Sequence, residues 1–161
     1  LKVDKLWYSF PVGDFKFTVG ALVENYYMVE TPTRYKPILK AFKLGGYGAV
    51  MGASTGQGFG VQWRQNVAPG EAALNIAANY VADGGEGASS DSELGMFGSA
   101  TDGYFLSQVG YGDRKWYISA LYAHKQGADG SKPAMGYSTP AASNYDEALN
   151  AFGLRGFWTP E

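Results

Sequence analysis

The 161-residue chain contains no cysteine, a single histidine and no long uninterrupted run of apolar residues. The absence of cysteine excludes a disulfide scaffold and any cysteine-ligated metal site. A single histidine cannot supply the histidine pair that many metal sites use. Because a membrane-spanning helix needs an apolar run of about 18 residues or more, the sequence predicts no transmembrane helix.

Charged residues are also scarce, at 17% of the chain, whereas soluble domains average about a quarter. The formal net charge is −2, so the chain lacks the basic surplus expected of a protein that binds nucleic acid. In contrast, the sequence is rich in glycine (23 residues) and tyrosine (12 residues). Glycine lets strands approach closely, and aromatic residues form belts at membrane interfaces, so both enrichments favour a membrane-spanning sheet.

Short and long connections alternate along the chain, between segments in which apolar and polar residues also alternate. The short connections lie at 11–14, 66–71 and 112–114, and the long ones span roughly 28–57, 84–102 and 126–147. Outer-membrane β-barrels have short turns on one side of the membrane and long loops on the other, whereas a soluble β-sandwich has no reason to collect its long loops at one end. The rhythm therefore predicts an all-β fold, a transmembrane antiparallel β-barrel, and such barrels are either pores or plugged transporters.

The clearest predicted strand is Phe15–Tyr27, where side chains alternate with a period of two. Its apolar stripe contains Phe15, Phe17, Val19, Ala21 and Val23, and its polar stripe contains Lys16, Thr18, Gly20 and Glu24. Similar alternation occurs at 59–64, 74–80, 116–123 and 152–158, whereas 104–111 is strand-like without a clear assignment of its faces. A soluble sheet with one face on a core gives the same alternation. Strands of about 10 residues, however, are longer than the soluble mode of about 5–6, which favours the barrel.

The polar stripes predict which side chains line a water-filled lumen. The pore-lining candidates are Lys16, Glu24, Gln62, Arg64, Asn75, Asn79 and Arg155. The long loop at 28–57 adds four basic residues around a predicted short helix: Arg34, Lys36, Lys40 and Lys43. If this loop folds inward, it narrows the pore and favours anions. The alternative is a basic loop in solvent or against lipid headgroups.

One motif suggests catalysis. Residues 52–56 match the nucleophile pattern G-x-S-x-G around Ser54, and an Asp and His124 follow in the order that α/β-hydrolases use. That pattern requires a helix after the serine, whereas the residues that follow alternate like a strand. In a chain with 23 glycines the match arises easily by chance, so we expect no catalytic site.

An acidic stretch lies in the second long loop, and its members are Asp83, Glu86, Asp91, Glu93 and Asp102. The spacing of these residues is not that of a calcium-binding loop. We interpret the stretch as a solvated loop; capture of divalent ions at a barrel mouth is a weaker alternative. The sequence therefore predicts no resident metal and no cofactor.

The segments at 4–14 (DKLWYSFPVGD) and 153–161 (GLRGFWTPE) resemble the cyanobacterial outer-membrane porins, the SomA-like or iron-uptake porins of the OprB carbohydrate-porin superfamily. This resemblance spans the chain and implies a passive diffusion channel for inorganic ions and small hydrophilic solutes. It also implies a homotrimer in contact with outer-membrane lipids. A structural envelope protein that links the outer membrane to the cell wall and conducts little is the alternative.

The resemblance covers only part of such a porin. Family members usually carry an N-terminal S-layer-homology domain that ties the barrel to a cell-wall polymer, and no such domain is expected within residues 1–161. We expect about seven strands, whereas porins typically use about 16–18. An odd number of strands with two unpaired edges cannot close by itself in lipid, so we expect an interior part of a single larger barrel.

Overall fold

Alternating apolar and polar residues form long strands in the computed structural model of the protein. The described residues are 3–30, 55–83, 90, 95–98, 101, 103–126 and 149–159. The strands are β1 (Leu6–Val12), β2 (Phe15–Glu24), β3 (Thr55–Arg64), β4 (Ala73–Asp83), β5 (Gly103–Gly112), β6 (Trp116–Gln126) and β7 (Leu149–Trp158). A short 3-10 helix, η1 (Asn25–Met28), follows β2. Among the described residues no helix has the length and hydrophobicity to cross a membrane.

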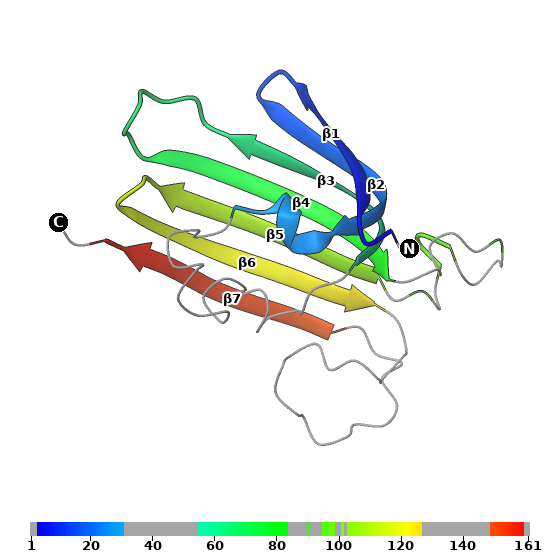
Figure 1. Cartoon of the computed structure of the whole chain (residues 1–161). Coiled ribbons are helices and arrows are strands. Elements are labelled where there is room, and N and C mark those ends of the chain that lie inside the picture. Colours follow the sequence, from blue (N-terminus) through cyan, green and yellow to red (C-terminus); the bar gives the residue numbers. More distant parts are fainter. Residues whose placement is uncertain are drawn as a thin grey trace.

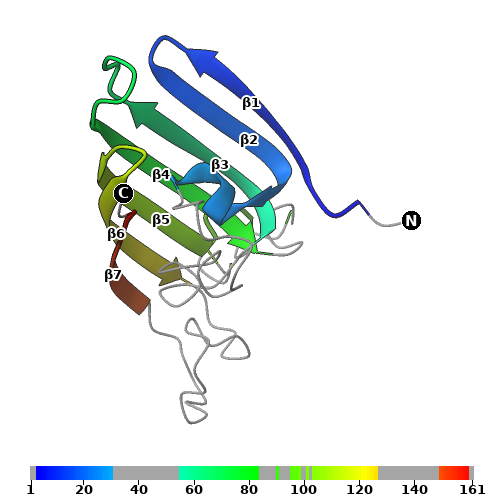
Figure 2. The ribbon, with the colours of Figure 1, turned by 60° about the vertical axis from the view of Figure 1, so that its left-hand side comes forward.

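The seven strands form one antiparallel sheet in the order of the sequence, β1 to β7 (Figure 1). The sheet curls, and η1 lies against one of its faces (Figure 2). Within the described residues β1 and β7 do not pair with each other, so the sheet is not closed. The prediction of an all-β antiparallel fold is confirmed, and the described strands form an open sheet.

The short and long connections lie at opposite ends of the sheet (Figure 1). At the turn end, the β1–β2 connection is two residues long and contains Gly13, whose φ of 59° suits glycine. In the β5–β6 turn, Asp113 accepts hydrogen bonds from the backbone N–H groups of Lys115 (2.6 Å) and Trp116 (3.0 Å). These bonds hold the pKa of Asp113 below its usual value. Long connections follow β2, β4 and β6 at the other end, which we call the loop end.

Strand register assigns each side chain to one of two faces. We call the face that packs against η1 the covered face, and the opposite one the bare face. A cross-strand row on the covered face contains Lys16, Gln62, Ala77, Gln108, Leu121 and Gly153. The adjacent row on the bare face contains Phe17, Val61, Ala78, Ser107, Tyr122 and Phe152. The register also assigns β5, whose faces the sequence left open.

A β-bulge breaks the alternation predicted for 15–27. Gly20 pairs with Gly58 and Val23 pairs with Gly56, so β2 carries one extra residue between these pairs. Val23 therefore turns to the covered face, where it is 1% exposed and packs with buried neighbours. Its predicted place on the apolar stripe was wrong, because an inserted residue reverses the face of every residue that follows.

The chain then leaves the sheet earlier than the sequence predicted. β2 ends at Glu24, and η1 turns the chain across the covered face. Two apolar side chains from this segment are buried there, Met28 against Val23 and Val81, and Val29 in a larger cluster. The buried members of that cluster are Val29, Ala77, Tyr104, Leu106, Leu121 and Ala123. The hydrophobic core thus lies between residues 25–30 and the covered face.

Candidate functional site

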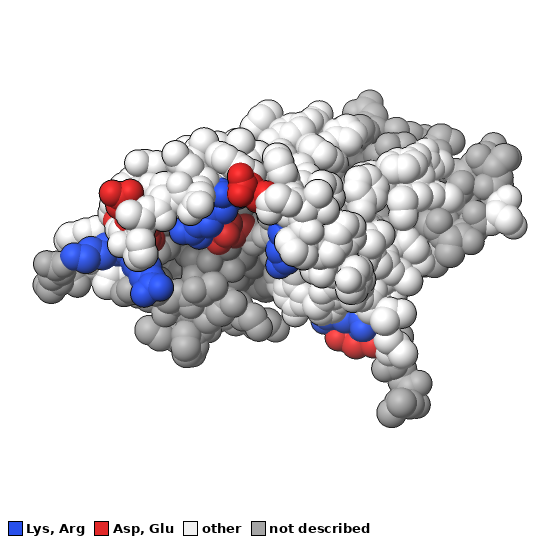
Figure 3. Space-filling model, turned by 90° about the horizontal axis from the view of Figure 1, so that it is seen from above, with Lys and Arg blue, Asp and Glu red and all other residues white. Residues whose placement is uncertain are grey.

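Exposed apolar side chains spread over the bare face of the sheet. Val19, Ile76 and Val109 lie on three different strands and are 45–51% exposed. The three cross-strand rows that pass through Phe15, Phe17 and Val19 contain no Asp, Glu, Lys or Arg from β1 to β7. Seen from above, most of the visible Lys, Arg, Asp and Glu side chains gather on the left part of the described surface (Figure 3). An apolar surface that crosses a whole sheet marks an interaction site, because soluble monomers rarely expose one.

Aromatic residues border the bare face at both ends. Toward the turn end, the rings of Tyr111 and Trp116 lie 5.6 Å apart in an edge-on contact. Toward the loop end, Asn150 Oδ1 accepts a hydrogen bond from the hydroxyl of Tyr122 (2.7 Å) and lies 3.0 Å from Nδ1 of His124. The bare face thus changes from apolar to polar at the row of His124. Amphipathic side chains at such a border suit a boundary between hydrocarbon and water.

On the covered face, side chains from three strands hold the backbone of residues 25–30. Asn79 Nδ2 on β4 donates to the carbonyl of Asn25 (3.0 Å). Gln108 Nε2 on β5 donates to the carbonyl of Glu30 (3.0 Å). The guanidinium of Arg155 on β7 donates to the same carbonyl. The segment is thereby fixed at both of its ends.

The donors to Glu30 belong to a buried polar network. Gln108 is 1% exposed, and its amide lies 2.9 Å from the hydroxyl of Tyr117, to which it donates. The hydroxyl of Tyr117 in turn donates to Asn75 Oδ1 (2.9 Å). Tyr117 can lie there because Gly110 has no side chain; a Cβ at that position would collide with the tyrosine hydroxyl. Since each partner orients the next, the network presets the position of the Gln108 amide.

Charge on the covered face is concentrated around Glu30. Its carboxylate lies 3.6 Å from the guanidinium of Arg64, and both side chains are partly exposed. Arg155, on β7 of the same face, donates to the Glu30 backbone carbonyl and also donates through Nε to Ser119 Oγ (3.0 Å). Two guanidinium groups therefore meet at Glu30, Arg64 near its carboxylate and Arg155 at its backbone carbonyl.

The structure brings six of the seven predicted pore-lining residues to the covered face. These six are Lys16, Gln62, Arg64, Asn75, Asn79 and Arg155. The bulge places Glu24 opposite Thr55, out of register with this set. Glu24 is buried at the loop end, where its carboxylate lies 3.2 Å from the ammonium of Lys5. Hydrogen bonds with Asp4 and Glu24 raise the pKa of Lys5.

Other residues of the covered face were missed by the sequence reasoning. Gln108 and Tyr117 connect the network, and neither was among the predicted site residues. Tyr117 did have a signal, because it alternates with Trp116 and Ile118 on a strand with assigned faces. The loop candidates Arg34, Lys36, Lys40 and Lys43 lie outside the described residues.

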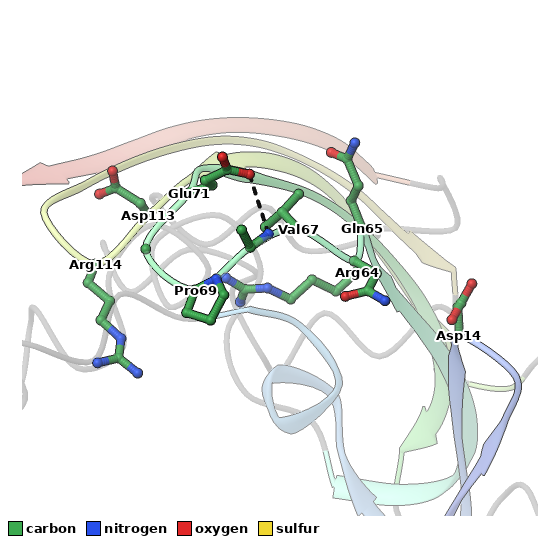
Figure 4. A pocket seen from close by; sticks show the side chains of 11 residues that line it. Asp14, Arg64, Gln65, Val67, Pro69, Glu71, Asp113 and Arg114 are labelled. Atoms are coloured by element: carbon green, nitrogen blue, oxygen red, sulfur yellow. Dashed lines mark hydrogen bonds between the residues drawn. The ribbon is translucent and has the colours of Figure 1, made fainter.

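A cleft of about 460 Å³ lies among the short turns (Figure 4). Charged side chains at its edge come from three turns, but the turns themselves use two of the carboxylates. Glu71 accepts the backbone N–H of Ala68 (3.3 Å), and Asp113 caps the β5–β6 turn. We therefore interpret the cleft as a space between neighbouring turns.

Two further sequence motifs can be compared with the fold. β3 begins at Thr55, directly after Ser54, where the hydrolase pattern requires a helix. His124 contacts Asn150 at the border of the bare face. Within the described ranges no group of three or more His, Asp or Glu side chains could hold a metal ion.

No family model matches the chain, and no curated protein or solved structure matches it either. The resemblance to porins therefore stays a prediction. The arguments for function rest on the geometry of the two faces.

Proposed function

We propose that the protein is an outer-membrane porin, a passive diffusion channel for inorganic ions and small hydrophilic solutes. One observation carries the proposal: an uncharged apolar face and a face with polar and charged groups oppose each other across all seven strands. In this proposal the bare face contacts the lipids of the outer membrane. Solutes pass along the covered face.

Strand length supports a membrane-spanning role. β2 has 10 residues, and β4 and β6 have 11 each. A tilted transmembrane strand needs about 9–11 residues to cross the hydrocarbon. Within the sheet the backbone groups are paired between strands, as a lipid environment demands. Strands β2 to β7, with 10 or 11 residues each, are thus long enough and apolar enough on one side to cross a bilayer, whereas β1 has seven residues.

The covered face supplies groups that suit a hydrated path. Lys16 and Arg64 are exposed there, and Gln62 lies in the same cross-strand row as Lys16. Residues 25–30 lie on the same face and reduce the space above it. Fixed charges near a permeating ion bias its local concentration, so Arg64, Arg155 and Glu30 would set ion preference. By the porin resemblance, the channel is a homotrimer. The same resemblance implies that a further domain of such a porin binds a cell-wall polymer.

A second function is favoured by a different observation. The cluster around Val29, Leu106 and Leu121 is buried and apolar, and it fills part of the covered face. If residues 25–30 block the path completely, the protein is a structural envelope protein that conducts little. The two functions share the membrane-embedded bare face and differ in whether ions pass.

Conductance of the purified protein in a planar bilayer tests the proposal. We expect stepwise increases in current on insertion, with unit conductance that rises in proportion to salt concentration, as for a water-filled pore. Insertion into vesicles is measured in parallel by protection from protease. Protection without conductance would favour the structural envelope protein. Absence of both would contradict the membrane-embedded sheet itself.

A further inference from the structure

The chain after β4 contains a short structured turn beside the bare face. Thr101 is fully buried, and its hydroxyl donates to the carbonyl of Gly95 (2.6 Å). The backbone N–H of Gly98 donates to the same carbonyl (3.2 Å), and the N–H of Thr101 donates to the carbonyl of Gly98 (3.2 Å). These bonds give the turn a defined conformation.

Aromatic contacts attach this turn to the bare face. The hydroxyl of Tyr80 on β4 donates to the carbonyl of Met96 (2.7 Å). The ring of Phe97 lies 5.0 Å from the ring of Tyr80 and 6.3 Å from that of Phe59. Phe59 and Tyr80 are cross-strand partners on the bare face. The turn is therefore continuous with the apolar surface of the sheet.

Phe97 nevertheless remains 68% exposed. It protrudes from the loop end of the bare face on the uncharged tetrapeptide Gly95–Gly98. Exposure of an aromatic side chain to water is unfavourable, because removing apolar surface from water lowers the free energy. A turn that fixes such a side chain in an exposed position beside the apolar bare face extends the apolar surface that a partner can cover.

We propose that Met96 and Phe97 form an interfacial anchor, which inserts into lipid at the boundary between headgroups and acyl chains. This inference rests on the proposed function, since it needs the bare face to contact lipid. Lipid fits better than a protein partner because the uncharged turn is continuous with the bare face, which contacts lipid in the proposed function. Aromatic side chains are enriched at this depth of a bilayer.

The absence of cysteine from the chain permits a direct test with single nitroxide labels. We choose Phe97→Cys for the anchor, Ile76→Cys for the middle of the bare face and Ser90→Cys for an exposed polar position. The labelled proteins are reconstituted in phosphatidylcholine vesicles. Collision rates are then measured with oxygen, which concentrates in lipid, and with a nickel chelate, which stays in water.

We expect the label at position 97 to collide at least several-fold more with oxygen than with nickel, relative to the label at position 90. The label at 76 should give a higher ratio still. A nickel-accessible label at 97, together with a lipid-exposed label at 76, would overturn the anchor and leave the proposed function intact. Nickel accessibility at both positions would overturn the proposed function.

A label at 97 that neither reagent reaches would also overturn the lipid anchor, because it would indicate contact with a second copy of the chain. Met96→Cys provides a second probe of the same turn, so that the result does not depend on one substitution. Since the ring contacts of Phe97 among the described residues are with Phe59 and Tyr80, its replacement should leave the sheet folded.

Discussion

The segments that follow β2 and β4 leave the same end of the sheet and fold onto opposite faces. Residues 25–30 lie on the covered face, where polar side chains bind their backbone carbonyls. Residues 95–98 contact the bare face, where two aromatic rings and one hydroxyl hold them. The covered face therefore holds its segment by backbone hydrogen bonds together with burial of Met28 and Val29, and the bare face holds its segment mainly by ring contacts.

This difference shows what each face can accept. Hydrogen bonds from Asn79 and Gln108 are directional, so the covered face fixes the position of one backbone segment. Contacts among Phe59, Tyr80 and Phe97 depend mainly on burial of apolar surface, which is less directional. We infer that the covered face fixes the position of a bound backbone segment, whereas the bare face can pack against any apolar partner.

The largest effect should come from placing a charge on the bare face. Val61 and Gln62 are neighbours on β3 that face opposite sides. If the bare face contacts lipid, Val61→Arg should destabilise the reconstituted protein by about 2–4 kcal/mol near the bilayer midplane. Urea unfolding from vesicles measures this difference in the free energy of unfolding.

Gln62→Arg is the matched control for that substitution, because it adds the same side chain one residue away on the covered face. We expect it to fold like the native protein and to change single-channel conductance instead. Equal destabilisation by both substitutions would contradict the proposal that only the bare face contacts lipid. Greater destabilisation by Gln62→Arg would indicate that the covered face contacts lipid instead.

An intermediate effect on stability should follow from removing a hydrogen bond that fixes residues 25–30. Gln108→Leu removes the donor to the Glu30 carbonyl and to Tyr117, and it leaves buried groups without a partner. The cost in folding free energy should be about 1–3 kcal/mol. If residues 25–30 narrow the path, mean conductance should rise and its fluctuations should increase.

Gln62→Leu serves as the comparison, because the buried Oε1 of Gln62 has no hydrogen-bond partner in the described residues. It should change stability less than Gln108→Leu and leave the current fluctuations unchanged. A Gln108→Leu channel with native conductance would show that the segment lies outside the ion path.

The smallest change in stability should come from Arg64→Gln. The Arg64–Glu30 pair is 3.6 Å long and more than a third exposed on both sides, so its loss should cost less than about 1 kcal/mol. Removal of one positive charge near the path should still shift the reversal potential in a salt gradient toward cation preference. Arg114→Gln, at an exposed turn residue, is the control, and an equal shift there would contradict a role specific to Arg64.

Period-two alternation made most of the strands and their faces predictable. It located the bare face on β2, β3, β4, β6 and β7, because hydrophobic and polar residues alternate over most of these strands. It failed at Val23 and Glu24, because the bulge depends on pairing with β3 and has no signature in one strand. It left β5 unassigned, since Ser107 stands on the bare face where an apolar residue is expected.

The candidate site was less predictable for a related reason. Lys16, Gln62 and Arg64 could be placed because their strands alternate clearly. The binding of residues 25–30 could not, because its acceptors are the backbone carbonyls of Asn25 and Glu30, which every residue carries. A side-chain pattern reports which face a residue occupies, but not which backbone segment will cover that face.

The direction of the two edge strands limits what can complete the sheet. Since neighbouring strands are antiparallel and the order is β1 to β7, both edges run from the loop end to the turn end. Direct pairing of β7 with β1, in the same molecule or in a copy of equal orientation, would therefore be parallel. Anything that joins both edges by antiparallel pairing must insert an odd number of strands. The sheet thus requires an odd number of additional strands to close it by antiparallel pairing, whichever chain supplies them.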